Sequence, residues 1–251
     1  MHQEVSIDAF DLAFYRHQGH LTVNGVFTHA EMDAVTRDIE QWGESFLAEL
    51  PVEQRAWYVD GGVQARTVLR KLDNPHFHRD AVQALARDRR LVDRVECIVG
   101  RGVSVYFSQI FFKAPEGGGP KPAHQDNYYF GPTDIEGVVT AWIALDDSTL
   151  ENGCLYFGDG TNQGPVYAHE APTGEPFNLQ LPAALLAKQP MVPAPVRKGG
   201  ISFHHGNTFH QSGPNHSAHW RRACALHFVR SDVEFATPAL PYNHALKLKI
   251  S

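Results

Sequence analysis

Five short segments in the second half of the chain constrain its fold more than any other feature. Each is rich in β-branched or aromatic residues and is bounded by Gly, Pro, Asn or Asp, which is the pattern of short β-strands. They begin at Val103 (VSVYFSQIFFK), Val138 (VVTAWIALDD), Cys154 (CLYF), Gly200 (GISFHH) and Arg221 (RRACALHFVR). Several antiparallel strands with irregular connections favour a closed barrel or a double-sheet jelly roll. We therefore expect a mainly β core at residues 101–235, covered by helices on one face.

The first hundred residues carry helical patterns instead. Thr28 and Glu31 form a capping-box motif, which marks the start of a helix. Apolar residues then recur at helical spacing at Val35, Ile39, Trp42, Phe46 and Leu50. A second helical region is expected from about Arg79 to Val99, with Gly100 as its C-terminal stop. We expect residues 1–100 to form a helical buttress for the β core.

Residues 158–199 differ from both regions, because they are rich in Pro and Gly and show no clear periodicity. Structureless connections of this length are uncommon in compact domains unless they have a function. We therefore expect this segment to be a lid or an insert in the jelly-roll core. No internal repeat or linker divides the 251 residues, so we expect a single domain over residues 1–251.

The charge and hydropathy of the chain limit the classes of partner that we expect it to bind. The formal net charge is −6, and the densest basic group, Arg87, Arg89 and Arg90, fits a solvated helix face better than a track for phosphates. We therefore expect no nucleic-acid partner. No apolar run approaches the roughly 20 residues that span a bilayer, and residues 1–10 lack the pattern of a secretory leader. These features predict a cytoplasmic protein that does not bind membranes.

The sequence His124-Gln125-Asp126 offers two metal-ligating side chains. In an extended backbone, side chains two residues apart point to the same side, so His124 and Asp126 would face one cavity while Gln125 faces away. A borderline divalent ion such as Fe(II) accepts an imidazole and a carboxylate, and a third ligand would complete a facial triad with open positions. Alone, a His-x-Asp pair is weak evidence, because the chain has 15 histidines and such pairs also occur at surfaces.

Five histidines of the segment FHHGNTFHQSGPNHSAHW are candidates for the third ligand. His204 and His205 are adjacent, so a strand would send at most one of them into the cavity, and we expect structural roles for both. His216 and His219 fall between a turn and the next expected strand, where we expect them to be exposed. His210 precedes Gln-Ser-Gly-Pro-Asn, a turn sequence that would fix the backbone at the rim of a barrel.

Arg221 follows His210 by eleven residues, at the start of an expected strand. If the chain turns between them, both side chains can face the same cavity. The planar fork of arginine suits bidentate binding of a carboxylate, which a dicarboxylate co-substrate requires at its distal end. A lone Arg on a strand is usually a surface ion-pair partner, but here it would lie behind a candidate metal triad.

At these residues the sequence resembles the phytanoyl-CoA dioxygenase family of iron- and 2-oxoglutarate-dependent oxygenases. The family pattern is HxD, a later H-x-S-G-x-N, and an Arg eleven residues after that histidine, and every part is present. The resemblance covers most of the chain and implies a cupin-like jelly roll, a double-stranded β-helix. It implies iron on His124, Asp126 and His210. It also implies that Arg221 and Ser212 hold the distal carboxylate of 2-oxoglutarate.

Four further residues match co-substrate positions of the family. Trp142 matches a tryptophan that borders 2-oxoglutarate, and Lys71 and Gln109 fall where relatives place further contacts. Thr161 lies where relatives usually read Gly-Ser-His or Gly-Thr-His, and here the following residue is Asn162.

The resemblance implies an oxidoreductase that uses Fe(II), 2-oxoglutarate and O2 to hydroxylate an unactivated C–H bond of a small-molecule substrate, with release of succinate and CO2. Halogenating members of related groups replace the triad carboxylate by a small residue, so Asp126 favours hydroxylation, desaturation or ring closure. Two alternatives stay open. One is a cupin-like metalloenzyme that does not use 2-oxoglutarate, and the other is a non-catalytic relative that binds metal and ligand. The motifs specify neither the substrate nor the oligomeric state.

Overall fold

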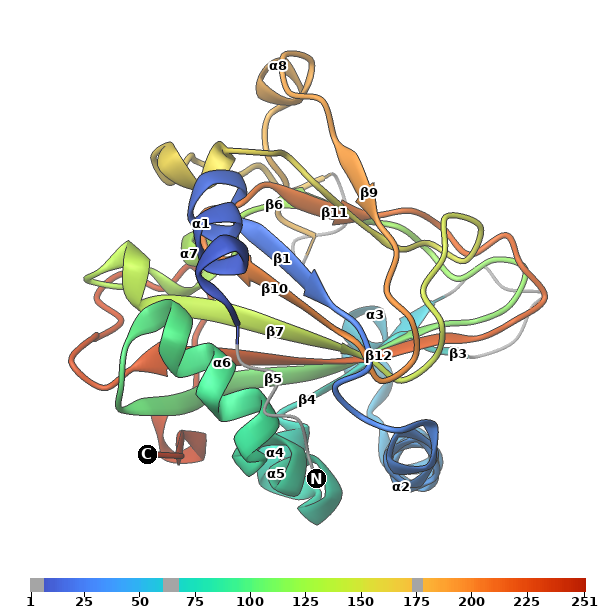
Figure 1. The fold of residues 1–251 in the computed structure, drawn as a ribbon. Coiled ribbons are helices and arrows are strands. Elements are labelled where there is room, and N and C mark those ends of the chain that lie inside the picture. Colours follow the sequence, from blue (N-terminus) through green and yellow to red (C-terminus); the bar gives the residue numbers. More distant parts are fainter. Residues whose placement is uncertain (1–6, 61–67, 173–177) are drawn as a thin grey trace.

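Two antiparallel sheets enclose a cavity, and helices cover the outer face of the larger sheet (Figure 1). The computed structural model describes residues 7–60, 68–172 and 178–251. The larger sheet has seven strands in the order β1-β10-β7-β12-β5-β13, with β4 also paired to β5. The smaller sheet has the order β6-β11-β8-β9. This arrangement confirms the expected mainly β, cupin-like fold with helical cover.

Helices are most frequent in the first hundred residues and strands in the remainder. The helices are α1 (Ala9–Gln18), α2 (His29–Glu49), α3 (Arg55–Tyr58), α4 (Pro75–His78), α5 (Asp80–Arg87), α6 (Arg89–Val99), α7 (Asp126–Phe130) and α8 (Ala183–Leu186). The strands are β1 (His20–Val23), β2 (Val59–Asp60), β3 (Val68–Leu69), β4 (Lys71–Asp73), β5 (Val103–Lys113), β6 (Lys121–His124), β7 (Val138–Ala144), β8 (Leu155–Phe157), β9 (Val192–Ala194), β10 (Ile201–His205), β11 (His210–Ser212), β12 (Arg221–Arg230) and β13 (Leu248–Lys249).

Four of the five expected strands lie side by side in the larger sheet as β5, β12, β7 and β10, and the fifth is β8 of the smaller sheet. Nearly every residue of the four central strands is buried. The reason is that helices cover one face of this sheet, while the cavity and the smaller sheet cover the other. A strand covered on both faces can carry apolar side chains on both, which explains why these segments are mainly apolar without a regular polar side.

Helix α2 begins at the residue that the capping box predicts. Thr28 Oγ1 accepts a hydrogen bond from the Glu31 backbone N–H, and the Glu31 carboxylate accepts one from the backbone N–H of Thr28. The region expected from Arg79 to Val99 is two helices, because Asp88 is extended (φ −64°, ψ 127°) and caps α6. That helix ends at Gly100, whose φ of 97° suits glycine.

The larger sheet also takes strands from outside residues 101–235. β1 pairs with β10, β4 with β5, and β13 with β5. The first hundred residues are therefore more than a helical buttress. These strands have only two to four residues, which is too short for a pattern of alternating side chains to be recognised in the sequence.

The segment 158–199 contains α8 and β9, and β9 pairs with β8 at the edge of the smaller sheet. Residues 173–177 of this segment lie outside the described residues. That the segment is a lid stays a prediction.

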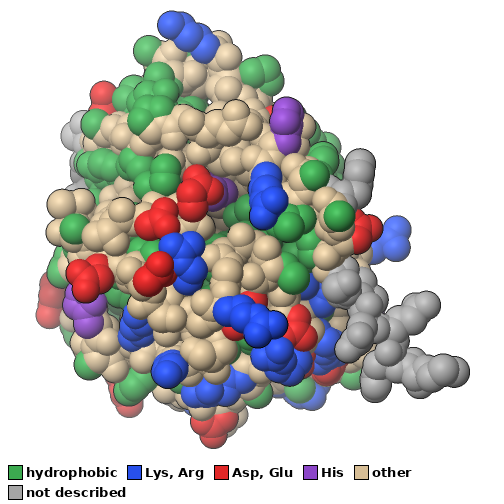
Figure 2. All heavy atoms as spheres, turned by 60° about the vertical axis from the view of Figure 1, so that its left-hand side comes forward, with side chains coloured by type: hydrophobic (Ala, Val, Ile, Leu, Met, Phe, Trp, Pro, Cys, Tyr) green, Lys and Arg blue, Asp and Glu red, His purple; other side chains and the backbone are tan. Residues whose placement is uncertain are grey.

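Charged side chains on the helices form ion pairs. Arg89 pairs with Asp93, and Arg90 pairs with Glu31 and Asp88. Acidic and basic side chains are interspersed over the face drawn in Figure 2. Within the described residues, no helix combines the length and apolarity that crossing a bilayer would need.

Candidate metal and co-substrate site

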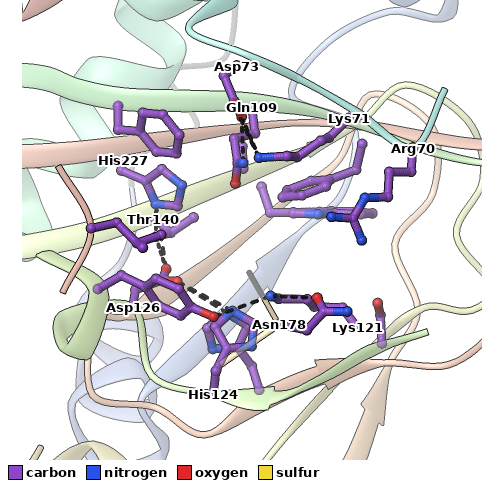
Figure 3. Close-up of a pocket in the computed structure, with 18 of the residues that line it drawn as sticks. Arg70, Lys71, Asp73, Gln109, Lys121, His124, Asp126, Thr140, Asn178 and His227 are labelled. Carbon is purple, nitrogen blue, oxygen red and sulfur yellow. Dashed lines mark hydrogen bonds and ion pairs between the residues drawn. The ribbon is translucent and has the colours of Figure 1, made fainter. Parts of the chain in front are cut away.

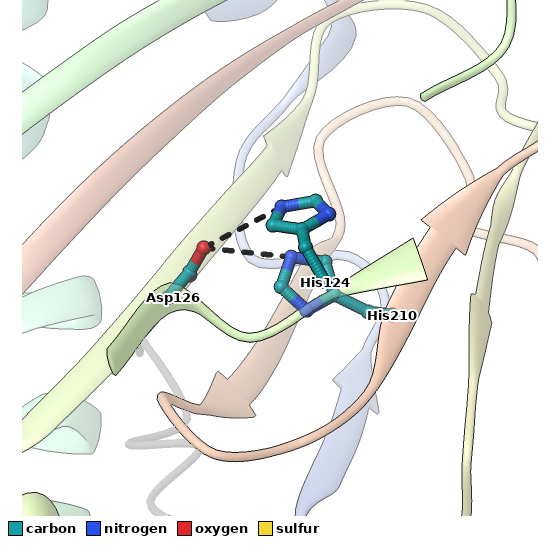
Figure 4. A group of neighbouring side chains, drawn as sticks. All are labelled: His124, Asp126 and His210. Atoms are coloured by element: carbon teal, nitrogen blue, oxygen red, sulfur yellow. Dashed lines mark ion pairs between the residues drawn. The ribbon is translucent and has the colours of Figure 1, made fainter. Parts of the chain in front are cut away.

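His124 and Asp126 meet His210, which is distant in sequence, at one point of the cavity (Figure 4). His124 is the last residue of β6, and it lies opposite His210, the first residue of β11. Asp126 Oδ1 is 3.7 Å from His124 Nε2 and 3.5 Å from His210 Nε2. One ligand atom from each residue lies within 4.8 Å of the others, and all three residues are buried. Two imidazoles and one carboxylate on one side of a point are the donor set of a facial triad.

Asp126 differs from the expectation in one respect, because it is the first residue of α7 and is not on a strand. Gln125 is extended (φ −119°, ψ 130°), so the reversal of side-chain direction holds across that residue before the helix begins. Gln125 faces away from the triad, as expected. Its amide nitrogen donates to Pro165 O and Asn207 O, which fastens the segment after β8 to the site.

Backbone carbonyls orient both histidines. His124 Nδ1 is 2.8 Å from Pro122 O, and His210 Nδ1 is 3.0 Å from Thr208 O. A carbonyl oxygen can only accept, so each Nδ1 carries the hydrogen and each Nε2 lone pair faces the centre of the triad. Burial lowers the pKa of both imidazoles, which keeps them in the neutral form that binds a metal.

The second carboxylate oxygen of Asp126 is held by a network of polar side chains. Oδ2 accepts hydrogen bonds from Thr140 Oγ1 at 2.6 Å and from His204 Nε2 at 3.2 Å. Thr140 Oγ1 is in turn 2.8 Å from His227 Nδ1. Burial alone would raise the pKa of Asp126, but His210, His204 and His227 hold it well below its usual range. The carboxylate therefore stays ionised, and its Oδ1 is turned toward the two histidines.

Sequence reasoning missed Thr140 and His227. Their signal is weak but present, because each lies an even number of residues from an expected cavity residue on the same strand, Trp142 on β7 and Arg221 on β12. His205 faces another way, since its Nδ1 accepts from the backbone N–H of Asn207.

Arg221 lies at the other end of the cavity, at the start of β12, and only 2% of its surface is exposed. Its guanidinium carbon is 5.4 Å from the centroid of the Trp142 ring. Among the described residues its Nε has no hydrogen-bond partner, and no carboxylate forms an ion pair with it. Burial lowers the pKa of Arg221 to about 9, so an anion beside it would relieve the cost of the buried charge.

The cavity has a volume of about 500 Å³ and is lined by both sheets. Ser212, Trp142, Lys71 and Gln109 all line it, and their contact with the co-substrate stays a prediction. Lys71 Nζ lies 3.0 Å from Asp73 Oδ2, and Gln109 Nε2 donates to Asp73 Oδ1 at 2.8 Å (Figure 3). A two-histidine, one-carboxylate donor set and a buried guanidinium without an anion fit iron(II) and 2-oxoglutarate.

Thr161 does not line this cavity, and its contact with the co-substrate stays a prediction. Its Oγ1 donates to Gly158 O at 2.6 Å and accepts from the backbone N–H of Phe209 at 2.9 Å. The hydroxyl is thereby used to hold the turn after β8. The change to Asn162 in the family motif was the available signal for this difference.

Comparison with known proteins agrees with the geometry. Residues 15–223 match the phytanoyl-CoA dioxygenase (PhyH) family. A probable alpha-ketoglutarate-dependent hypophosphite dioxygenase of Stutzerimonas stutzeri is 28% identical over 224 residues, which are 87% of this chain and 77% of that protein. Phytanoyl-CoA dioxygenase domain-containing protein 1 of Mus musculus is 36% identical over 160 residues, 61% of this chain and 51% of that protein. The match to the mouse protein therefore spans about half of its length.

Among solved structures, the non-heme alpha ketoglutarate dependent carbocyclase SnoK from nogalamycin biosynthesis has the same fold. The TM-score is 0.76 at 22% identity, and the match covers 97% of this chain and 96% of that one. The chain belongs to the phytanoyl-CoA dioxygenase family of iron- and 2-oxoglutarate-dependent dioxygenases.

Proposed function

We propose that this protein hydroxylates an unactivated C–H bond of a small molecule, using Fe(II), 2-oxoglutarate and O2 and releasing succinate and CO2. One observation carries the proposal. The buried triad of His124, Asp126 and His210 and the buried guanidinium of Arg221 face the same cavity. Iron(II) on the triad together with 2-oxoglutarate supplies the activation of O2 and the oxidising power for the C–H bond.

Each residue of the site has a defined task in this proposal. His124, Asp126 and His210 hold the metal through Nε2, Oδ1 and Nε2, respectively. Arg221 and Ser212 bind the distal carboxylate of 2-oxoglutarate, which turns its other end toward the triad. Asp126 supplies the carboxylate that halogenating relatives lack, which favours hydroxylation.

Thr140, His204 and His227 keep the Asp126 carboxylate in one orientation. Fixed ligands need no reorganisation when the metal and the co-substrate bind. The buried walls of the cavity limit access of water to the reacting groups.

We also propose that residues 158–199 act as a lid. The segment contacts the site, because Pro165 O accepts from the Gln125 side-chain amide, His169 Nε2 accepts from the backbone N–H of Gln125, and Asn178 lines the cavity. A cytoplasmic location is a further part of the proposal, supported by the free thiols of Cys97, Cys154 and Cys224.

The test is succinate formation by the purified protein. We expect conversion of 2-oxoglutarate to succinate that requires added Fe(II) and O2, and binding of 2-oxoglutarate to the Fe(II)-loaded protein without O2. Absence of both binding and conversion would contradict the proposal.

Arg221→Met separates this function from that of a metalloenzyme that does not use 2-oxoglutarate. We expect the dissociation constant for 2-oxoglutarate to rise about 30-fold or more, as when one partner of a buried ion pair is removed. Arg222→Met is the matched control, because Arg222 pairs with Asp146 and Glu40 and does not line the cavity. An equal response of the two variants would contradict the assignment of Arg221.

A further inference from the structure

Strand β5 has one extra residue relative to β12, its neighbour in the larger sheet. In the β5–β12 pair, Phe107 lies opposite His227, and the next pair is Val105 with Phe228. Tyr106, between them, has no partner residue on β12. Such a bulge breaks the alternation of side chains and can turn a side chain toward a nearby site. Tyr106 and Phe107 therefore both line the cavity, whereas Val105 belongs to the hydrophobic core shared with the helices.

Tyr242, from the segment after β12, lies against this part of β5. The strand that follows it, β13, pairs with β5 and fastens the segment there. The Tyr242 ring lies 5.2 Å from the Phe107 ring and 5.5 Å from the Phe130 ring, centroid to centroid. It lies 5.3 Å from the Tyr106 ring. All four side chains line the cavity, and we call them the aromatic pocket: Tyr106, Phe107, Phe130 and Tyr242.

The aromatic pocket is next to the triad. The Phe107 ring stacks on the ring of His227 at 5.7 Å, and the Phe130 ring lies 4.8 Å from the same histidine. His227 Nδ1 is 2.8 Å from Thr140 Oγ1, which donates to Asp126. In Figure 3, His227, Thr140 and Asp126 follow one another along one side of the cavity. A group bound in the aromatic pocket would therefore lie beside the metal ligands.

Two tyrosine hydroxyls of this pocket have no use within the described structure. Tyr106 is only 3% exposed, and among the described residues its hydroxyl has no hydrogen-bond partner. Tyr242 is half-buried, and within the described part of the chain its hydroxyl is neither fully covered nor hydrogen-bonded. Burial raises the pKa of Tyr106 to about 12, and burial followed by the charge of Asp126 holds the pKa of Tyr242 well above its ordinary value. Both hydroxyls therefore keep their protons at neutral pH and can donate.

We propose that the primary substrate has an apolar ring that lies in the aromatic pocket and an uncharged oxygen atom that accepts a hydrogen bond from the Tyr242 hydroxyl. The inference rests on the proposed function and names the class of its substrate. A flat ring makes a large apolar contact with aromatic side chains, in stacked or edge-to-face geometry. An ionised oxygen would lose its hydration among these rings, which favours an uncharged acceptor such as a ketone. Contacts at both points would hold a C–H bond of the substrate toward the triad.

Three probes with the same ring test the substrate class. Acetophenone has a ring and an uncharged oxygen, ethylbenzene has nearly the same shape without the oxygen, and benzoate carries an anionic group instead. Calorimetric titration into protein saturated with Fe(II) and 2-oxoglutarate, without O2, measures the binding of each probe. We expect acetophenone to bind about fivefold more tightly than ethylbenzene or benzoate, which is the effect of one neutral hydrogen bond.

Tyr242→Phe removes the hydroxyl and keeps the ring. We expect the dissociation constant for acetophenone to rise about fivefold, and those for ethylbenzene and 2-oxoglutarate to stay unchanged. Tyr242→Leu removes the ring as well and should weaken the binding of both acetophenone and ethylbenzene. Tyr156→Phe is the matched control, because Tyr156 is also half-buried but lies on β8 and does not line the cavity. This control should bind every probe like the unmodified protein.

Two results would overturn this inference. The first is that ethylbenzene or benzoate binds as tightly as acetophenone. The second is that Tyr242→Phe weakens the binding of acetophenone no more than Tyr156→Phe does. If Tyr106→Phe weakens it instead, the donor is Tyr106 and the assignment of Tyr242 is wrong. Failure of the unmodified protein to bind or convert 2-oxoglutarate would, by contrast, overturn the proposed function.

Discussion

The two faces of the larger sheet differ sharply, although they belong to the same strands. On β12, Leu226 and Phe228 face the helices and are fully buried in the main hydrophobic cluster. Arg221, Ala225 and His227 face the cavity. Because side chains alternate along a strand, each strand supplies apolar contacts to one face and functional groups to the other.

This difference shows how the fold leaves space for ligands on one face of the sheet. The helix-covered face is filled with large side chains, whereas the inner face has the small residues Ala144, Ala223 and Ala225 next to Trp142. Small side chains there leave space for a co-substrate. We therefore expect substitutions on the inner face to change activity and those on the outer face to change stability.

Asp126→Ala should have the largest effect on the inner face. We expect loss of iron binding and of succinate formation, because the carboxylate is both a metal ligand in the proposal and the acceptor for Thr140 and His204. The free energy of unfolding should change by no more than about 2 kcal/mol. Metal analysis and a urea titration measure the two quantities, and full turnover of the variant would remove Asp126 from the triad.

Leu226→Ala tests the outer face. This side chain is fully buried, so we expect the free energy of unfolding to fall by about 2–5 kcal/mol. The dissociation constant for 2-oxoglutarate should be unchanged below the unfolding transition. Ala225→Leu, at the adjacent inner position, should weaken 2-oxoglutarate binding with a smaller loss of stability. If both variants change only stability, the contrast between the faces is wrong.

Thr140→Val removes the hydroxyl that donates to Asp126 and keeps the shape of the side chain. Substitutions of groups that orient metal ligands weaken metal binding by about 10–100-fold. Competition with a chelator measures the iron affinity of the variant. Thr140→Ser retains the hydroxyl and should remain close to the unmodified protein, so equal losses in both would show that packing is responsible.

Glu31→Gln, on the outer helices, should have the smallest effect. Arg90 holds the pKa of Glu31 at about 2, below its ordinary value of 4.5. Its contribution is therefore complete above pH 4.5 and is lost as the pH falls toward 2. The pair is partly exposed, so we expect a loss of at most about 1 kcal/mol at pH 7. Urea titrations at pH 7 and pH 3 should show the gap to the unmodified protein narrowing, and a gap that widens at pH 3 would contradict this assignment.

The sequence by itself determined the parts of the molecule that depend on local patterns. The strands beginning at Val103, Val138 and Arg221 are long enough for their composition to be recognised, and the capping box at Thr28 needs only four residues. The types of the triad side chains and the spacing from His210 to Arg221 predicted a cavity that brings these groups together.

Only the tertiary structure decided the parts that depend on partners distant in sequence. β1 and β13 are strands because β10 and β5 offer them hydrogen bonds, and Thr140 and His227 acquire their roles because Asp126 lies beside them. Thr161 lies outside the cavity and Lys121 lines it, and neither position could be recognised from the residues next to them in the sequence. A side chain's neighbours in space are set by how the sheets pair and pack, and this information is not contained in the few residues on either side of it.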